Sequence, residues 1–216
     1  MPPSRVLPFL LFALGLAGLV EPAGAMDIGV ASGPGGRRIV VAKGPIVTGD
    51  AERLRVALPG ADRDASGLRT LALDSAGGSV VEAFHIAEAM DSDKVATIVR
   101  AGASCASACA QIVFLAGTYR TVEEGGRLGL HACSSGDHAT PDALCHEAIA
   151  QHAVLRGAPY GTIFAFMQMT LPGQIRWLDA EDSDCWGLTL WPPGSNRGIK
   201  PGEAPPCILH GAPPKK

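Results

Sequence analysis

Residues 71–80 read LALDSAGGSV, and this stretch sets the architecture of the chain. Its first three residues are apolar and predict a short buried strand, which leads into a turn of small residues with two adjacent glycines. Ser79 then begins a helix, since Glu82 follows it at the spacing of a capping box. One face of that helix is predicted to be buried, because apolar side chains recur at helical spacing at Val80, Ala83, Phe84, Ala87 and Met90.

The alternation of strand and helix continues on both sides of this stretch. Further strands are predicted over residues 38–42, 95–99 and 127–131. Helices are predicted over residues 48–58, 141–156, 160–169 and 179–186, and an apolar helix runs from residues 105–109 to Ala116. Strand–helix alternation of this kind predicts an α/β fold with a largely parallel sheet flanked by helices.

Composition limits the classes of protein that this chain can belong to. The 216 residues suit one domain, and 47% hydrophobic residues with 18% charged ones exclude wholesale disorder. A net charge of −3 gives no electrostatic reason to expect a nucleic acid as partner.

The first 25 residues have the three parts of a secretory signal peptide. Arg5 is followed by 15 apolar residues at 6–20 and by the cleavage sequence Ala23-Gly24-Ala25. An apolar run of that length is short for a transmembrane helix, which needs about 20 residues. We therefore expect a chain exported to the periplasm or secreted, with no stable membrane span after cleavage. The mature chain would have a flexible glycine-rich lead-in (26–37), a folded domain (38–191) and a Pro/Gly-rich tail (192–216).

An even number of cysteines in an exported chain favours disulfides over metal ligation. The six are Cys105, Cys109, Cys133, Cys145, Cys185 and Cys207. Proximity in the sequence favours the pairs Cys133–Cys145 and Cys185–Cys207, whereas Cys105 and Cys109 are either bridged or two buried thiols. A zinc site made of Cys133, His138, Cys145 and His146 is the alternative, but this spacing matches no common zinc module, and no metal is expected.

Three features could carry chemistry. The Gly77-Gly78 turn allows positive φ and backbone N–H groups that point outward, as an oxyanion site requires. Ser107 stands at the start of an apolar helix, where free N–H groups and the positive end of the helix dipole lie beside its hydroxyl. His131 ends a strand 24 residues later. Each feature taken alone has a plain structural explanation: a turn, a helix cap and a structural histidine.

Together these features resemble the proteolytic subunit of the Clp protease, and more broadly the Clp/crotonase superfamily with its exported bacterial Clp-like branch. The resemblance covers roughly residues 38–191. It rests on LDSAGGSV (73–80), ASA (106–108), LAG (115–117), GLH (129–131) and the closing segment 177–188.

The resemblance implies a fold of repeated ββα units and a site for acyl transfer. Ser107 would be the nucleophile and His131 the general base, and the backbone N–H groups of Gly78 and Ala108 would form the oxyanion hole. A serine hydroxyl needs such a base, because it is a weak nucleophile until an imidazole takes its proton.

The sequence departs from the family at the acid that orients the histidine. In the family this acid stands two residues before the aromatic that corresponds to Trp177, and here that position is Ile175. Asp179 follows closely, although it also stands where a helix cap is expected. Three outcomes are open: a Ser–His dyad, a triad completed by Asp179, or the fold without the activity.

The expected function is that of an exported serine hydrolase, a peptidase acting on peptide or protein substrates without a metal or organic cofactor. The family also implies a homo-oligomer, but no ATPase partner, because an exported chain does not meet cytosolic ATP. The first alternative is an inactive binding or assembly protein on the same fold. Acyl-CoA chemistry of the crotonase kind is the second alternative, and export argues against it because CoA thioesters are cytosolic.

Overall fold

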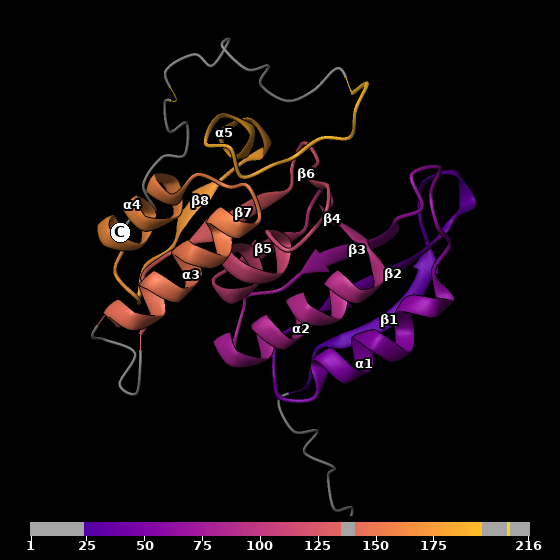
Figure 1. Cartoon of the computed structure of the whole chain (residues 1–216), viewed down its shortest axis with the longest axis horizontal. Helices are drawn as coiled ribbons and strands as arrows, with labels where there is room; N and C mark the ends of the chain where they lie inside the picture. Colours follow the sequence, from indigo (N-terminus) through magenta and orange to yellow (C-terminus); the bar gives the residue numbers. More distant parts are fainter. Residues whose placement is uncertain (1–23, 135–140, 196–206, 208–216) are drawn as a thin grey trace, which may run out of the picture.

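The computed structural model describes residues 24–134, 141–195 and 207, in which two β-sheets are flanked by helices (Figure 1). The larger sheet has the strand order β1-β2-β3-β4-β6, with β1 (Asp27–Ser32), β2 (Arg38–Lys43), β3 (Arg69–Asp74), β4 (Val95–Val99) and β6 (Arg120–Val122). The smaller sheet has the order β5-β7-β8, with β5 (Ser104–Ala106), β7 (Arg127–Leu130) and β8 (Arg176–Leu178).

Most neighbouring strands are parallel, as the alternating pattern predicted. The pairs β2–β3, β3–β4, β4–β6 and β5–β7 are parallel, whereas β1–β2 and β7–β8 are antiparallel. The α/β class with a largely parallel sheet is therefore confirmed.

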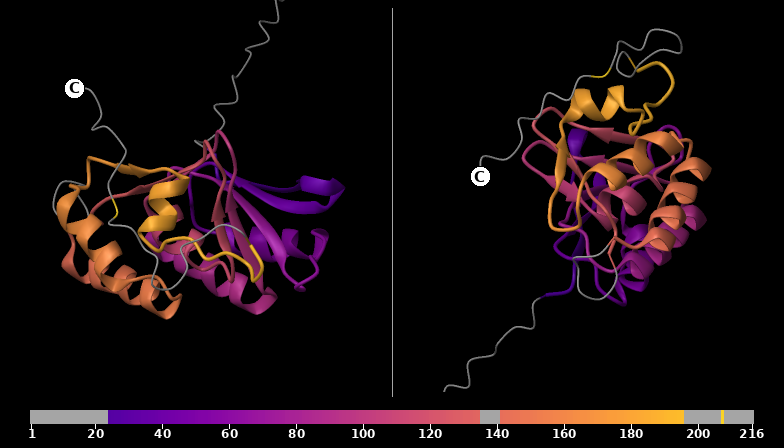
Figure 2. Two further views of the ribbon diagram at one scale, coloured as in Figure 1. Left: turned by 90° about the horizontal axis from the view of Figure 1, so that it is seen from above. Right: turned by 90° about the vertical axis from the view of Figure 1, so that its left-hand side faces the viewer.

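The helices pack on both sheets and on one another. They are α1 (Asp50–Ala57), α2 (Val80–Asp93), α3 (Ala143–Leu155), α4 (Tyr160–Met169) and α5 (Ala180–Cys185), with a π-helix η3 (Cys109–Phe114) and two 3-10 turns, η1 (Pro34–Gly36) and η2 (Leu58–Gly60). Figure 2 shows α1, α2 and α3 along one side of the molecule, and α2 contacts both α1 and η3. The predicted face of α2 is part of the core, with Ala83, Ala87 and Met90 buried and Val80 and Phe84 packed against them.

The flexible lead-in expected at residues 26–37 is wrong, because these residues form half of a β-hairpin. Strand β1 pairs with β2 along its whole length, from Asp27 opposite Lys43 to Ser32 opposite Arg38. The glycines that indicated flexibility form the turn instead, with Gly35 and Gly36 at positive φ. The conformational freedom of these glycines lets the chain reverse its direction. Pairing with β2 then satisfies the backbone hydrogen-bonding groups of β1 that face it.

Besides β1, three strands were not predicted from the sequence. The strands β5, β6 and β8 have three residues each, which is too short for a period-two pattern of apolar side chains to be recognised. Residues 1–23 and most of residues 192–216 lie outside the described residues, so the structure does not bear on the signal peptide or on most of the tail.

The capping box at the start of α2 is half formed. The Ser79 hydroxyl accepts a hydrogen bond from the Glu82 N–H at 3.2 Å, as predicted. The Glu82 carboxylate does not return the bond but accepts from the Ala51 N–H at 2.8 Å. Glu82 is buried beside the start of α1, whose first N–H groups lack partners within their own helix, and this tertiary contact replaces the local one.

Three disulfides join all six cysteines, with no free thiol. The pairs Cys133–Cys145 and Cys185–Cys207, predicted from proximity, are confirmed, with Cα separations of 6.0 and 5.6 Å. Within the described residues, no helix combines the length and the apolar character needed to cross a bilayer.

Candidate active site

The two sheets meet beside Ser107. At the end of β3, the Ser75 N–H donates to the Ser104 carbonyl at 2.7 Å, and the Ala106 N–H donates to the Ser75 carbonyl at 2.9 Å. These bonds join the end of β3 to β5. They bring the glycine turn that follows β3 next to the serine that follows β5.

Ser107 occupies a sharp bend between β5 and the π-helix η3. Its backbone is left-handed, with φ +55°. The Ser107 N–H donates to the Gly129 carbonyl of β7 at 2.9 Å, and its carbonyl accepts from the Gln111 N–H at 2.9 Å. The side chain is half-buried, and its hydroxyl forms no hydrogen bond with any described residue. The position of the Ser107 hydroxyl is therefore set by the backbone of the bend and not by a hydrogen bond of its own.

A disulfide spans the Ser107 bend. Cys105 lies on β5 and Cys109 opens η3, their Cα atoms are 5.3 Å apart, and both side chains are fully buried. Of the two alternatives for this pair, the structure shows the bridge. The sequence pattern placed both cysteines on one helix. In the structure they do not share a helix, because the strand β5 extends to Ala106.

The glycine turn packs directly against the serine. A Cβ atom on Gly77 would lie 2.6 Å from the Ser107 Cβ and 2.7 Å from the Ala106 carbonyl oxygen. On Gly78, a Cβ atom would lie 2.2 Å from the Ile46 carbonyl oxygen. Both glycines have positive φ, +92° and +147°. A side chain on Gly77 would therefore push the turn away from Ser107, and one on Gly78 would push it away from Ile46.

Two backbone donors remain unused at this junction. Among the described residues, neither the N–H of Gly78 nor that of Ala108 donates a hydrogen bond. Gly78 is exposed and Ala108 follows Ser107 directly. These are the N–H groups that the family resemblance assigned to the oxyanion hole.

His131 leaves the same end of the smaller sheet as Ser107, because β5 and β7 are neighbouring parallel strands. Its imidazole is half-buried, and Nδ1 lies 2.8 Å from the carbonyl oxygen of Ala132. Burial disfavours the imidazolium and lowers the pKa of His131 below its usual value, although the bond to Ala132 opposes this shift. Among the described residues, no hydrogen bond joins His131 to Ser107 or to a carboxylate.

The structure does not bring Asp179 to His131. The antiparallel register of β7 and β8, continued by one residue, places Ile175 opposite His131. Asp179 lies four residues further along, which is about 13 Å on a strand. Its carboxylate caps α5 by accepting from the Asp182 N–H at 2.9 Å. The hypothesis of a triad completed by Asp179 is therefore not supported by its position.

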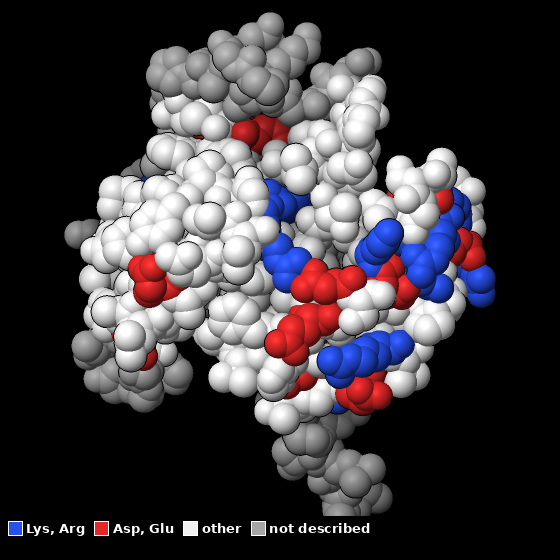
Figure 3. Space-filling model, in the orientation of Figure 1, with Lys and Arg blue, Asp and Glu red and all other residues white. Residues whose placement is uncertain are grey.

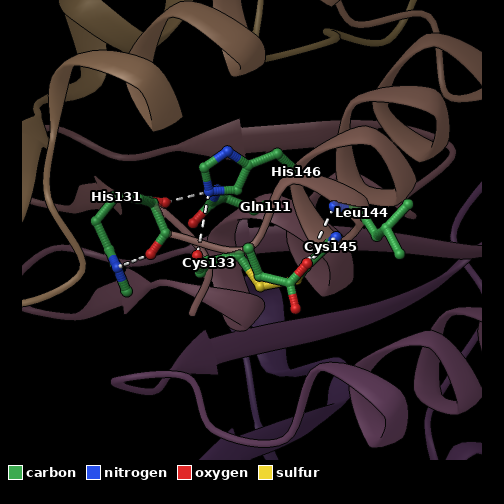
Figure 4. Close-up of a disulfide and its surroundings, with 8 residues drawn as sticks. Gln111, His131, Cys133, Leu144, Cys145 and His146 are labelled. Atoms are coloured by element: carbon green, nitrogen blue, oxygen red, sulfur yellow. Dashed lines mark hydrogen bonds between the residues drawn. A yellow bond between two sulfur atoms is a disulfide. The ribbon is translucent and has the colours of Figure 1, made fainter. Parts of the chain in front are cut away.

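Further contacts, which the sequence analysis missed, hold the chain around His131 (Figure 4). The buried Gln111 amide donates to the His131 carbonyl at 3.2 Å. Two residues on, the Cys133 carbonyl accepts from Nε2 of His146 at 3.2 Å, and the Cys133–Cys145 disulfide ties the segment to α3. The sequence did contain a signal for Gln111, because it is an amide within the otherwise apolar run at 109–114.

The alternative zinc site is excluded by the same disulfide, because the sulfurs of Cys133 and Cys145 are bonded to each other and are not thiolates. His138 lies outside the described residues. Within the residues that the structure covers, no group of three or more metal-ligating side chains comes together.

Charged side chains of both signs gather on one face of the molecule. Figure 3 shows Lys and Arg interleaved with Asp and Glu on one side of the molecule. Arg63 and Arg69 both pair with Asp93 at the end of α2, and Arg156 of the α3–α4 connection pairs with Asp91. The two signs thus largely compensate each other on this face.

No protein-family model matches the chain, and no curated protein matches its sequence.

Proposed function

We propose that this chain is an exported serine hydrolase with a Clp/crotonase-like fold, in which Ser107 takes the acyl group of a peptide bond as the amine leaves and then passes it to water. The observation that carries the proposal is the left-handed backbone of Ser107 at a strand-to-helix bend. Backbone strain of this kind gathers at functional sites, and a serine on such a bend projects its hydroxyl away from the sheet.

The chemistry needs three groups in addition to the hydroxyl of Ser107. Nε2 of His131 takes the hydroxyl proton as Ser107 attacks a carbonyl carbon, and later returns it to the leaving amine. The N–H groups of Gly78 and Ala108 stabilise the oxyanion that forms. Loss of one such donor typically raises the barrier by about 3 kcal/mol.

Export is supported by the three disulfides. All six cysteines are paired, and disulfides persist mainly in oxidising compartments. Together with the signal-peptide pattern of residues 1–25, this favours the periplasm or the extracellular space.

Labelling with a fluorophosphonate, which reacts with activated serines, tests the proposal. We expect the mature, oxidised protein to be labelled, and labelling to be lost in Ser107→Ala and reduced at least a hundredfold in His131→Ala. Ser104→Ala is the matched control, because Ser104 lies three residues earlier on β5, and it should label like the wild type. Absence of labelling in a folded sample, with or without reductant, would overturn the proposal.

The second candidate is a catalytically inactive binding or assembly protein on the same fold. The observation that favours it is Ile175, which stands opposite His131 where a carboxylate would orient the imidazole. Loss of the orienting acid alone costs about ten-thousand-fold in triad proteases. This candidate predicts that Ser107→Ala and His131→Ala leave every cellular phenotype of the protein unchanged.

A further inference from the structure

We infer that the backbone carbonyl of Ala132 replaces the missing acid and orients His131 as a base. Nδ1 of His131 lies 2.8 Å from that oxygen. A carbonyl oxygen can only accept a hydrogen bond, so Nδ1 must carry the proton. In a neutral imidazole the lone pair is then on Nε2, the nitrogen that a Ser–His mechanism needs.

The carbonyl of Ala132 belongs to a segment that is held on several sides. Ala132 is buried, and its N–H donates to the Thr170 carbonyl at the end of α4 at 2.7 Å. The preceding carbonyl, of His131, accepts from Gln111, and the following residue, Cys133, is covalently joined to α3. These contacts fix the peptide that bears the acceptor, as packing fixes the carboxylate of a triad.

This arrangement explains how an apolar residue is tolerated opposite the histidine. With Nδ1 bonded to Ala132, no carboxylate is needed at the position opposite His131 that Ile175 occupies. A neutral acceptor fixes the tautomer without adding a negative charge. The imidazolium therefore gains less stabilisation than it would beside a carboxylate.

The inference concerns the orientation of the base and, for its role in catalysis, rests on the proposed function. Its direct test does not need activity. Nitrogen-15 NMR of the ring distinguishes the two tautomers of a neutral histidine, and a His131→Gln variant assigns the signal. His146 and His152 are internal references of the opposite tautomer, because each donates from Nε2 to a backbone carbonyl, of Cys133 and Ile112.

We expect His131 to carry its proton on Nδ1 above its pKa, in the wild type and in Ser107→Ala alike. A proton on Nε2, or rapid exchange between the two tautomers, would overturn the inference whether or not the protein is labelled. The NMR result and the labelling result can also disagree. If His131 carries its proton on Nδ1 but the protein is never labelled by the fluorophosphonate, the proposed function is overturned and the inference about the orientation of His131 stands.

A substitution supplies the second test. In Ile175→Asp a carboxylate faces His131, with Ile175→Asn as the uncharged control of the same shape. Because Ala132 already sets the tautomer, we expect the labelling rate at pH 7.5 to rise less than about tenfold in Ile175→Asp relative to Ile175→Asn. A gain of about a thousandfold would show that the imidazole had lacked an orienting group, and the inference would be wrong.

Discussion

Ser107 and Lys94 are the two non-glycine residues with positive φ in the described part of the chain, both at +55°. Lys94 ends α2, a position where left-handed backbone is common. Ser107 precedes the first residues of a helix, where left-handed backbone is uncommon, and this conformation costs about 1–3 kcal/mol. Under the proposed function, the bend trades this stability for the position of the hydroxyl.

Replacing Ser107 with glycine should release this strain. We expect Ser107→Gly to unfold with a free energy about 1 kcal/mol higher than that of Ser107→Ala, since both remove the hydroxyl but only glycine accepts positive φ without strain. Urea denaturation of the two variants measures the difference. Equal stabilities would mean that the bend holds no strain.

The rate of fluorophosphonate labelling should follow the titration of His131. The base is active when neutral, and burial places its pKa below the usual value. The labelling rate should therefore fall as the pH is lowered, with a midpoint below the usual pKa of histidine. A midpoint at or above the usual histidine pKa would show that a negative charge stabilises the imidazolium.

The Ser107 bend is held by β5 and β7 on one side and by η3 on the other. The π-helix η3 carries Gln111 toward His131, and the Cys105–Cys109 bridge joins its first residue to β5. Single π-helical turns are rare and occur often at functional sites. The bridge closes a loop of only four residues, so its constraint on the unfolded chain is small compared with that of longer loops.

Removal of this bridge should affect the site more than the fold. We expect Cys105→Ala/Cys109→Ala to be labelled at least tenfold more slowly than the wild type while remaining folded, because Ser107 loses its covalent frame. The control is Cys185→Ala/Cys207→Ala, which opens a longer loop near α5 and should keep its labelling rate. Circular dichroism at the assay temperature confirms folding. An unchanged rate in the first variant would show that the bridge serves stability alone.

Across the whole molecule, Arg120 connects parts that are distant in sequence. This buried side chain of β6 donates to the Leu188 carbonyl at 2.6 Å and to the Arg156 carbonyl at 2.8 Å. Burial lowers its pKa to about 10, and the nearby Arg156 charge adds to this shift, so Arg120 stays charged at neutral pH. It ties the central sheet to the C-terminal segment and to the end of α3.

Loss of Arg120 should destabilise the entire domain. We expect Arg120→Met to lower the free energy of unfolding by about 3 kcal/mol or more, because buried carbonyls lose their donors. Arg55→Met, at an exposed position of α1, should change it by less than about 0.5 kcal/mol. Urea denaturation monitored by tryptophan fluorescence compares the two. A cost below about 1 kcal/mol for Arg120→Met would show that water replaces its hydrogen bonds.

Much of the fold could be predicted from local sequence. Helix α4 has the predicted bounds, 160–169, and the start of α2 at Ser79 follows from its cap. The strands β5, β6 and β8 could not be predicted, because three residues carry too little pattern. The hairpin of β1 was missed because its glycines indicate flexibility until a partner strand is known.

The local order of apolar runs, glycine turns and cysteines was sufficient for the α/β class, two of the three disulfide pairs and the candidates Ser107 and His131. These features depend on residues that are close in sequence. The position of Ile175 opposite His131, the carbonyl of Ala132 at Nδ1 and the burial of Arg120 became visible only in the folded chain. Each depends on the pairing of segments far apart in sequence or on a backbone atom, and a backbone carbonyl has no side chain by which a sequence could reveal it.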